Sequence, residues 1–403
     1  MSSTTYSPYS SRYQAVTGLG YDGVVRIRVG DYYATGVLLS DGRSLLTAAH
    51  LYTNVVNAVA DTEIFFETIT QNKTSSLAQS VTVHPDYSSV TTGADLAIIR
   101  LDDSAFIDAQ RYSIYRNDNI ENQLFTMVGY GKAGTGSEGS ETSSSTPTRR
   151  MADNTIDGDI DLLNYYLGSA LAWHAPDGTQ FIADFDNGSY TNDAVGRLLN
   201  TAHIGVGSQE GLIASGDSGG PAFIDDKIAG IASYTASLSN GSVHPDIDSV
   251  NNSSYGEIAA WQKLSYYQEW IDEQQRAHYE NAPTKAQDVK KEVDENDSGT
   301  AYAYFLLEFT GLRSYQSQIL SVDYTTRDGT ARADEDYIAI SDTLILYPDQ
   351  TQAVIAVEII GDSYAEADEI FYLDLTNPIG GSFGDGAVML SAMRTILNDD
   401  FIA

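Results

Sequence analysis

The chain contains the stretch Gly216-Asp217-Ser218-Gly219-Gly220-Pro221, and this stretch decides both its fold and its chemistry. It places a serine among glycines, which leave the neighbouring backbone N–H groups free to bind a developing oxyanion. Ser218 is therefore a candidate nucleophile. A serine hydroxyl attacks a carbonyl only when a base accepts its proton and an acid orients that base. The sequence must supply a histidine and a carboxylate elsewhere.

Both partners lie upstream of the serine. His50 ends the run Leu45-Leu46-Thr47-Ala48-Ala49-His50, where an apolar strand delivers a histidine into a loop. Asp95 begins a second apolar run, Asp95-Leu96-Ala97-Ile98-Ile99-Arg100-Leu101. Alone, the first pattern is typical of a structural histidine and the second of a strand-edge aspartate. In the order His, Asp, Ser and together with the hexapeptide, they predict a catalytic triad.

These motifs resemble those of the trypsin/chymotrypsin-like serine proteases, T-A-A-H, D-[IL]-A and G-D-S-G-G-P. The resemblance covers about the first 280 residues. It implies an all-β fold made of two six-stranded β-barrels and a C-terminal helix. It also implies that His50 is the general base, that Asp95 orients its imidazole and that Ser218 attacks the scissile carbonyl. The backbone N–H groups of Gly216 and Ser218 would form the oxyanion hole.

The same resemblance indicates where the substrate side chain would bind. Ser233-Tyr234-Thr235 resembles the strand that pairs with the substrate backbone beside the specificity pocket. Counting back from Ser218, Leu212 occupies the position that is an aspartate in trypsin-like members, and Thr235 stands where wide pockets have glycine. The pocket residues Leu212, Ser233 and Thr235 therefore predict a small or medium aliphatic side chain before the cut, and not Lys or Arg.

The resemblance also raises the question of activation. In the family, a freed N-terminus often pairs with the aspartate that precedes the catalytic serine, here Asp217. The segment Ala15-Val16-Thr17-Gly18 is a weak match to such an N-terminus. The alternative is that Asp217 finds a local hydrogen-bond partner and needs no cleavage.

Composition bounds the class of protein. A chain of 403 residues with 42% apolar residues, 34 glycines and only 9 prolines is ordered, β-rich and long enough for at least two domains. The absence of cysteine excludes disulfides and thiolate metal sites. A net charge of −34 argues against nucleic acid as a partner and fits an exported bacterial protein in salty water. No apolar run is long enough for a membrane span, and residues 1–14 lack the pattern of a secretory signal.

The segment after about Ala286 forms a second module of β-patterned runs. It contains Val322-Asp323-Tyr324-Thr325-Thr326-Arg327-Asp328-Gly329, then Glu366-Ala367-Asp368-Glu369-Ile370-Phe371 and Ile396-Leu397-Asn398-Asp399-Asp400. These motifs resemble a Calx-β domain, which implies an immunoglobulin-like sandwich with calcium-binding carboxylates at one end. The candidate ligands by this resemblance are Glu295, Asp328, Asp362, Glu366, Glu369, Asp399 and Asp400. An acidic sandwich without metal is the alternative.

We therefore predict an N-terminal extension (1–14), a protease domain (15–280), a linker (281–287) and a Calx-β domain (288–403). The predicted function is that of a secreted, monomeric serine endopeptidase acting on proteins or peptides, with structural calcium in the C-terminal domain and no cofactor for catalysis. The competing prediction is a calcium-dependent adhesion or anchoring protein whose protease-like domain is inactive. The intact residues His50, Asp95 and Ser218 favour the first.

Overall fold

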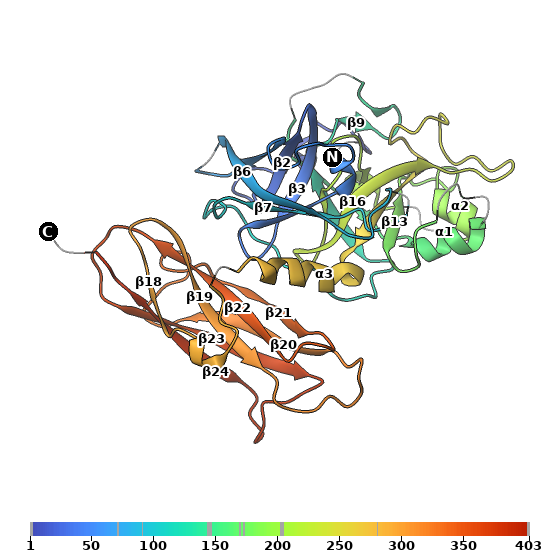
Figure 1. Cartoon of the computed structure of the whole chain (residues 1–403). Helices are drawn as coiled ribbons and strands as arrows, with labels where there is room; N and C mark the ends of the chain where they lie inside the picture. Colours follow the sequence, from blue (N-terminus) through green and yellow to red (C-terminus); the bar gives the residue numbers. More distant parts are fainter. Residues whose placement is uncertain are drawn as a thin grey trace. The chain divides into compact units, whose positions relative to one another are not determined.

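The computed structural model describes residues 3–70, 72–90, 92–142, 147–168, 171, 174–201, 205–279 and 281–400 (Figure 1). The chain divides into two compact units. The first comprises Met1–Leu39 and Arg43–Ile271, and the second comprises Ser40–Gly42 and Asp272–Ala403. Both are built mainly of strands, which confirms the all-β prediction. No helix in the described part of the chain is long and apolar enough to cross a membrane.

The first half of the N-terminal unit is a closed, antiparallel six-stranded barrel in the order β2-β3-β4-β7-β6-β5, as predicted. Apolar residues such as Ile27, Leu45 and Ile99 are fully buried and fill it. The strands are β2 (Val24–Val29), β3 (Tyr32–Leu38), β4 (Ser44–Thr47), β5 (Thr62–Glu67), β6 (Asn72–Val83) and β7 (Ala97–Leu101). Short 3-10 helices are η1 (Ser11–Tyr13), η2 (Ala49–Tyr52), η4 (Gly207–Gln209) and η5 (Ala286–Asp288).

The second half of this unit is a curled seven-stranded sheet in the order β11-β8-β15-β16-β17-β13-β12 (Figure 1). It has one strand more than the predicted second barrel, because β12 adds to its edge beside β13. Its core is aromatic: the Trp261 ring stacks on Phe181 at a centroid distance of 5.4 Å. The strands are β8 (Leu124–Gly129), β11 (Arg150–Thr155), β12 (Gly158–Asp159), β13 (Gln180–Asp184), β15 (Pro221–Ile224), β16 (Lys227–Ser237) and β17 (Glu257–Lys263).

A four-stranded sheet ties the start of the chain to this half. Its order is β10-β9-β1-β14, with bounds β1 (Ser3–Thr4), β9 (Gly134–Thr135), β10 (Gly139–Ser140) and β14 (Gly211–Leu212). Ser3 and Thr4 are completely buried. Residues 3 and 4 thus belong to the packed structure of the unit, although the sequence places them in an extension.

Three α-helices are described: α1 (Ile160–Leu167), α2 (Ala194–Leu199) and α3 (Leu264–Ala277). The first two lie in this unit, and α3 begins in it and ends beyond its last residue, Ile271. On α3 the three- and four-residue spacing of apolar residues predicts one buried face. Leu264, Tyr267 and Ile271 are indeed buried. The C-terminal helix implied by the resemblance is confirmed.

The second unit is a seven-stranded sandwich, as predicted. One sheet has the order β18-β24-β23-β20-β21 and the other pairs β19 with β22. The core between them includes Phe371, whose ring stacks on Tyr337 at 4.6 Å. The strands are β18 (Glu292–Asp294), β19 (Gly299–Glu308), β20 (Leu320–Asp328), β21 (Ser341–Leu346), β22 (Gln352–Gly361), β23 (Glu369–Ile379) and β24 (Leu390–Leu397).

Candidate active site

The imidazole of His50 is held by a buried carboxylate. His50 lies on η2, directly after β4, and Asp95 precedes β7 and is completely buried. Asp95 Oδ2 lies 2.8 Å from His50 Nδ1, and Asp95 Oδ1 accepts a hydrogen bond from the His50 backbone N–H at 2.8 Å. Because Nδ1 faces the carboxylate, Nε2 is left to exchange protons with a nucleophile. The structure brings these two predicted residues together.

Two features of the fold deliver Asp95 to this position. The preceding Ala94 has φ of +54°, a left-handed conformation unusual for a residue with a side chain, and its N–H donates to Tyr267 Oη on α3 at 2.7 Å. From the other side, Ser233 Oγ donates to Asp95 Oδ2 at 2.5 Å. The pairing of β16 with β17 shifts between Ala232 and Tyr234, so a bulge turns Ser233 toward the aspartate.

The loop that carries Ser218 is fastened to the first barrel by Thr35 on β3. The Thr35 N–H donates to the Ser218 carbonyl at 3.0 Å, and Thr35 Oγ1 donates to the Gly216 carbonyl at 2.9 Å. Gly219 packs against the end of β4, where an added Cβ would lie 2.1 Å from Thr47 Oγ1, so only glycine fits. These contacts bring Ser218 to the end of β4, from which His50 follows. Sequence reasoning missed Thr35, because a lone threonine in a strand carries no signal.

The proposed oxyanion donors are available. Gly216 has φ of +98°, and in the described structure the N–H groups of Gly216 and Ser218 donate to no protein acceptor. No hydrogen bond joins Ser218 Oγ to His50 among the described residues. Such contacts are often long before substrate binds. The two backbone N–H groups are thus left open to bind an oxyanion beside Ser218.

Asp217 is buried and finds its partners locally. Its Oδ1 accepts the N–H of Gly131 at 2.8 Å, and its Oδ2 accepts the N–H of Ala214 at 2.9 Å. These bonds match the alternative in which no freed N-terminus is needed. The backbone around Ala15 is engaged elsewhere, since its carbonyl accepts a bond from Arg149 at 3.4 Å.

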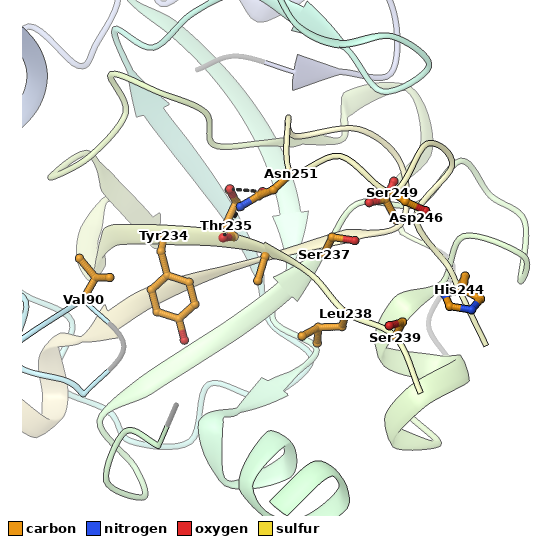
Figure 2. Close-up of a pocket in the computed structure, with 11 residues that line it drawn as sticks. Val90, Tyr234, Thr235, Ser237, Leu238, Ser239, His244, Asp246, Ser249 and Asn251 are labelled. Atoms are coloured by element: carbon orange, nitrogen blue, oxygen red, sulfur yellow. Dashed lines mark hydrogen bonds between the residues drawn. The ribbon is translucent and has the colours of Figure 1, made fainter. Parts of the chain in front are cut away.

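The predicted pocket residues fall in two places. Ser233 and Thr235 lie on β16, and Thr235 lines a cavity of about 670 Å³ that follows this strand (Figure 2). Leu212 is instead packed in the core of the second half, where it pairs with Ser3. The structure thus places Leu212 away from the lining of this cavity. The preference for an aliphatic side chain stays a prediction.

Carboxylates gather at one end of the Calx-like sandwich, as predicted. Ligand oxygens of Asp336, Glu366 and Glu369 lie within 4.8 Å of one another and could hold a metal ion. Glu295 is buried beside them; its burial and the charges of Asp362 and Glu366 raise its pKa to about 7. Burial and the neighbouring Asp336 raise the pKa of Glu369 to about 7 as well. Such shifts express the repulsion among clustered carboxylates.

Not every predicted ligand takes part in this cluster. Asp328 accepts hydrogen bonds from Tyr337 Oη at 2.6 Å and from Ala333 N–H at 3.0 Å, which lower its pKa. Asp336, which was not among the predicted ligands, belongs to the cluster. The charge of Asp399 acts on Asp400, whose pKa is raised mainly by desolvation.

A second group of acidic residues is buried in the protease-like unit. Five carboxyl groups, each at most 2% exposed, surround the end of β13. They are Asp157, Asp184, Asp186, Asp193 and Glu210. Burial and the charge of Asp186 raise the pKa of Glu210 to about 8, and burial raises that of Asp186 to about 6. Burial also raises the pKa values of Asp157 and Asp184.

These shifts predict how stability depends on pH. The pKa of Glu210 rises from 4.5 to about 8 on folding, so the folded state binds the proton more tightly. The contribution of this proton to the free energy of unfolding is complete below pH 4.5 and is lost as the pH rises toward 8. In chelator, we expect the melting temperature of the unit to fall over this range. Glu210→Gln should flatten the fall, whereas Glu138→Gln, an exposed control, should not. Parallel curves for all three proteins would contradict the assignment.

Comparison with known proteins agrees with the geometry. Residues 4–161 match the family model for trypsin, and residues 292–400 match that for the Calx-beta domain. The chain therefore carries a trypsin domain followed by a Calx-beta domain. The trypsin match includes His50 and Asp95 and ends before Ser218. The two predicted families are confirmed.

Relatives match only parts of the chain. Human sodium/calcium exchanger 2 is 30% identical over 152 residues, covering 31% of this chain and 16% of the exchanger. Adhesion G-protein coupled receptor V1 of Danio rerio is 41% identical over 86 residues, covering 21% of this chain and 1% of the receptor. The chain thus spans a small fraction of these relatives. Among solved structures, neuropsin, a serine protease expressed in the limbic system of mouse brain, is 16% identical with a TM-score of 0.46, covering 65% of this chain and 98% of neuropsin.

Proposed function

We propose that this protein is a serine endopeptidase that hydrolyses peptide bonds through an ester on Ser218. The observation that carries the proposal is the buried Asp95 carboxylate, 2.8 Å from His50 Nδ1, within residues that match the trypsin model. The Ser218 loop is fastened to the same barrel through Thr35. Proteins or peptides are the substrates. The proposal extends to a secreted monomer that does not bind nucleic acid, in keeping with the net charge of −34.

The residues would act in sequence. Ser218 Oγ forms a bond to the scissile carbonyl carbon while His50 accepts the hydroxyl proton, and Asp95 stabilises the resulting imidazolium. The N–H groups of Gly216 and Ser218 bind the oxyanion. The C–N bond breaks as His50 gives its proton to the leaving amine. Water then attacks the ester, gives its proton to His50, and Ser218 regains it. No step needs a metal.

A fluorophosphonate probe tests this proposal on the full chain. The probe phosphonylates a serine only when a neighbouring base activates it, so we expect one label, located at Ser218 by peptide mapping. His50→Ala should prevent labelling. A folded wild-type protein that takes up no probe would contradict the proposal and favour the adhesion or anchoring protein with an inactive protease domain.

The Calx-beta domain is proposed to bind structural calcium. Calcium prefers six to eight hard oxygen donors. Asp336, Glu366 and Glu369, together with the buried Glu295, bring several carboxylate oxygens to one place. When bound, the ion supplies positive charge that offsets their repulsion. The related exchangers carry calcium in their name, which agrees with this choice of ion.

Chelation is therefore expected to lower the melting temperature of this domain. Calcium at about a hundredfold above its dissociation constant adds about 2.7 kcal/mol to folded-state stability by mass action. Asp336→Asn with Glu369→Gln should abolish the response and also raise stability in chelator, because two repelling charges are gone. The exposed Asp385→Asn should respond like wild type. Scanning calorimetry of the full chain measures these melting temperatures. If calcium does not change the melting temperature of the wild type, the calcium proposal fails and the domain is an acidic sandwich without metal.

A further inference from the structure

Two buried carboxylates in the segment Asp246–Glu257 each present an oxygen without a hydrogen-bond partner. Asp246 is 8% exposed and Glu257 is 0% exposed. Asp246 Oδ2 and Glu257 Oε2 accept no hydrogen bond. Within the described residues, neither carboxylate forms an ion pair with a Lys or Arg. Burying an ionised carboxylate without such a partner is strongly unfavourable.

The two groups lie close together, and each is held by its other oxygen. Ser254 Oγ lies 3.4 Å from Asp246 Oδ1 and 3.4 Å from Glu257 Oε1. Asp246 Oδ1 accepts the N–H of Asp248 at 3.0 Å. Glu257 Oε1 accepts the N–H groups of Asn252 at 2.8 Å and Ser254 at 3.0 Å. The backbone thus orients both carboxylates while their second oxygens stay available.

A third oxygen belongs to the same segment. Asn252 Oδ1 is buried and also has no hydrogen-bond partner, while Asn252 Nδ2 donates to Asp248 Oδ2 at 2.9 Å. Two carboxylates and an amide carbonyl are the hard oxygen donors that calcium prefers. A proton would neutralise one of the two charges, whereas a divalent cation neutralises both.

We propose that Asp246 Oδ2, Asn252 Oδ1 and Glu257 Oε2 are ligands of a calcium ion in the protease-like unit. The ion holds the segment Asp246–Glu257 as a wall of the groove along β16. The ligand assignment stands on its own, and the role in substrate binding rests on the proposed peptidase function.

The segment is connected to the groove at three points. Asp246 lines the cavity beside β16, together with Thr235 (Figure 2). Asn251 caps Thr235: its Oδ1 accepts from Thr235 Oγ1 at 2.8 Å, and its Nδ2 donates to the Thr235 carbonyl at 3.0 Å (Figure 2). Ser253 Oγ donates to the Ile213 carbonyl at 2.8 Å, next to the loop of Ser218. Loss of the ion would release this wall and weaken peptide binding.

Calcium titration of the full chain tests the ligands. The starting protein carries Asp336→Asn and Glu369→Gln, so that the proposed Calx-beta site does not contribute. In isothermal titration calorimetry, Glu257→Gln and Asp246→Asn in this background should each bind one calcium ion fewer. The exposed Asp226→Asn is the control and should bind as many as the background. Equal numbers for all four proteins would overturn the site.

Two further measurements complete the design. Melting temperatures in chelator show whether each variant is folded. If Glu257→Gln does not fold, the test relies on Asp246→Asn alone. In saturating calcium, the ligand variants should raise KM for a peptide substrate several-fold, whereas the control Asp226→Asn should leave KM unchanged. Unchanged KM with a lost ion would overturn the role of the ion in the groove. If no protein cleaves peptides but one ion is still lost, the peptidase proposal fails and the cation site stands.

Discussion

Ser218→Ala is expected to lower kcat for peptide hydrolysis by about 10⁴- to 10⁶-fold. The variant lacks the oxygen that forms the ester, so only binding and the oxyanion donors remain. His50→Ala should lose about as much, and the double variant no more than either, because the two residues act as one unit. Asp95→Asn should cost about 10⁴-fold, since the amide favours the wrong imidazole tautomer.

The controls separate chemistry from folding. Ser137→Ala removes an exposed hydroxyl from the same unit and should leave kcat unchanged. The melting temperature of Ser218→Ala should stay close to that of wild type, because Thr35 holds the loop through backbone carbonyls that the substitution keeps. Comparable hydrolysis by wild type and Ser218→Ala would refute the nucleophile.

The second large effect concerns Asp217 and activation. The intact chain starting at Met1 should cleave peptides without prior processing, because Gly131 and Ala214 already satisfy the Asp217 carboxylate. Asp217→Ala leaves both N–H groups buried without an acceptor, at about 1–3 kcal/mol each. This cost destabilises the active conformation of the Ser218 loop relative to its other conformations, so we expect activity to drop by at least a factor of about ten.

Asp217→Asn provides the matched comparison, since it keeps one acceptor and should retain intermediate activity. N-terminal sequencing of the active protein shows whether cleavage has occurred. Activity that appears only after a cut near Ala15 or Val16 would restore the model in which a freed N-terminus pairs with Asp217.

The local sequence was sufficient to identify the candidate triad and the two modules. His50, Asp95 and Ser218 each lie in a short contiguous motif. Such a motif can be identified from adjacent residues alone, without knowledge of the fold. The same holds for the apolar runs of the strands and for the buried face of α3, because side-chain spacing decides which face is apolar. Length and composition were sufficient to predict two β-rich units.

The tertiary structure alone decided the contacts between distant residues. Thr35 reaches Gly216 across the fold, and a bulge in β16 turns Ser233 toward Asp95; neither follows from local pattern. In the sandwich, Asp328 accepts a hydrogen bond from Tyr337, and the acidic cluster contains Asp336, which was not among the predicted ligands. Whether a carboxylate is exposed, paired or buried with a free oxygen depends on the chain folded around it. For this reason the candidate triad could be identified from sequence, whereas the residues that support it and the proposed cation ligands in Asp246–Glu257 could be found only in the folded structure.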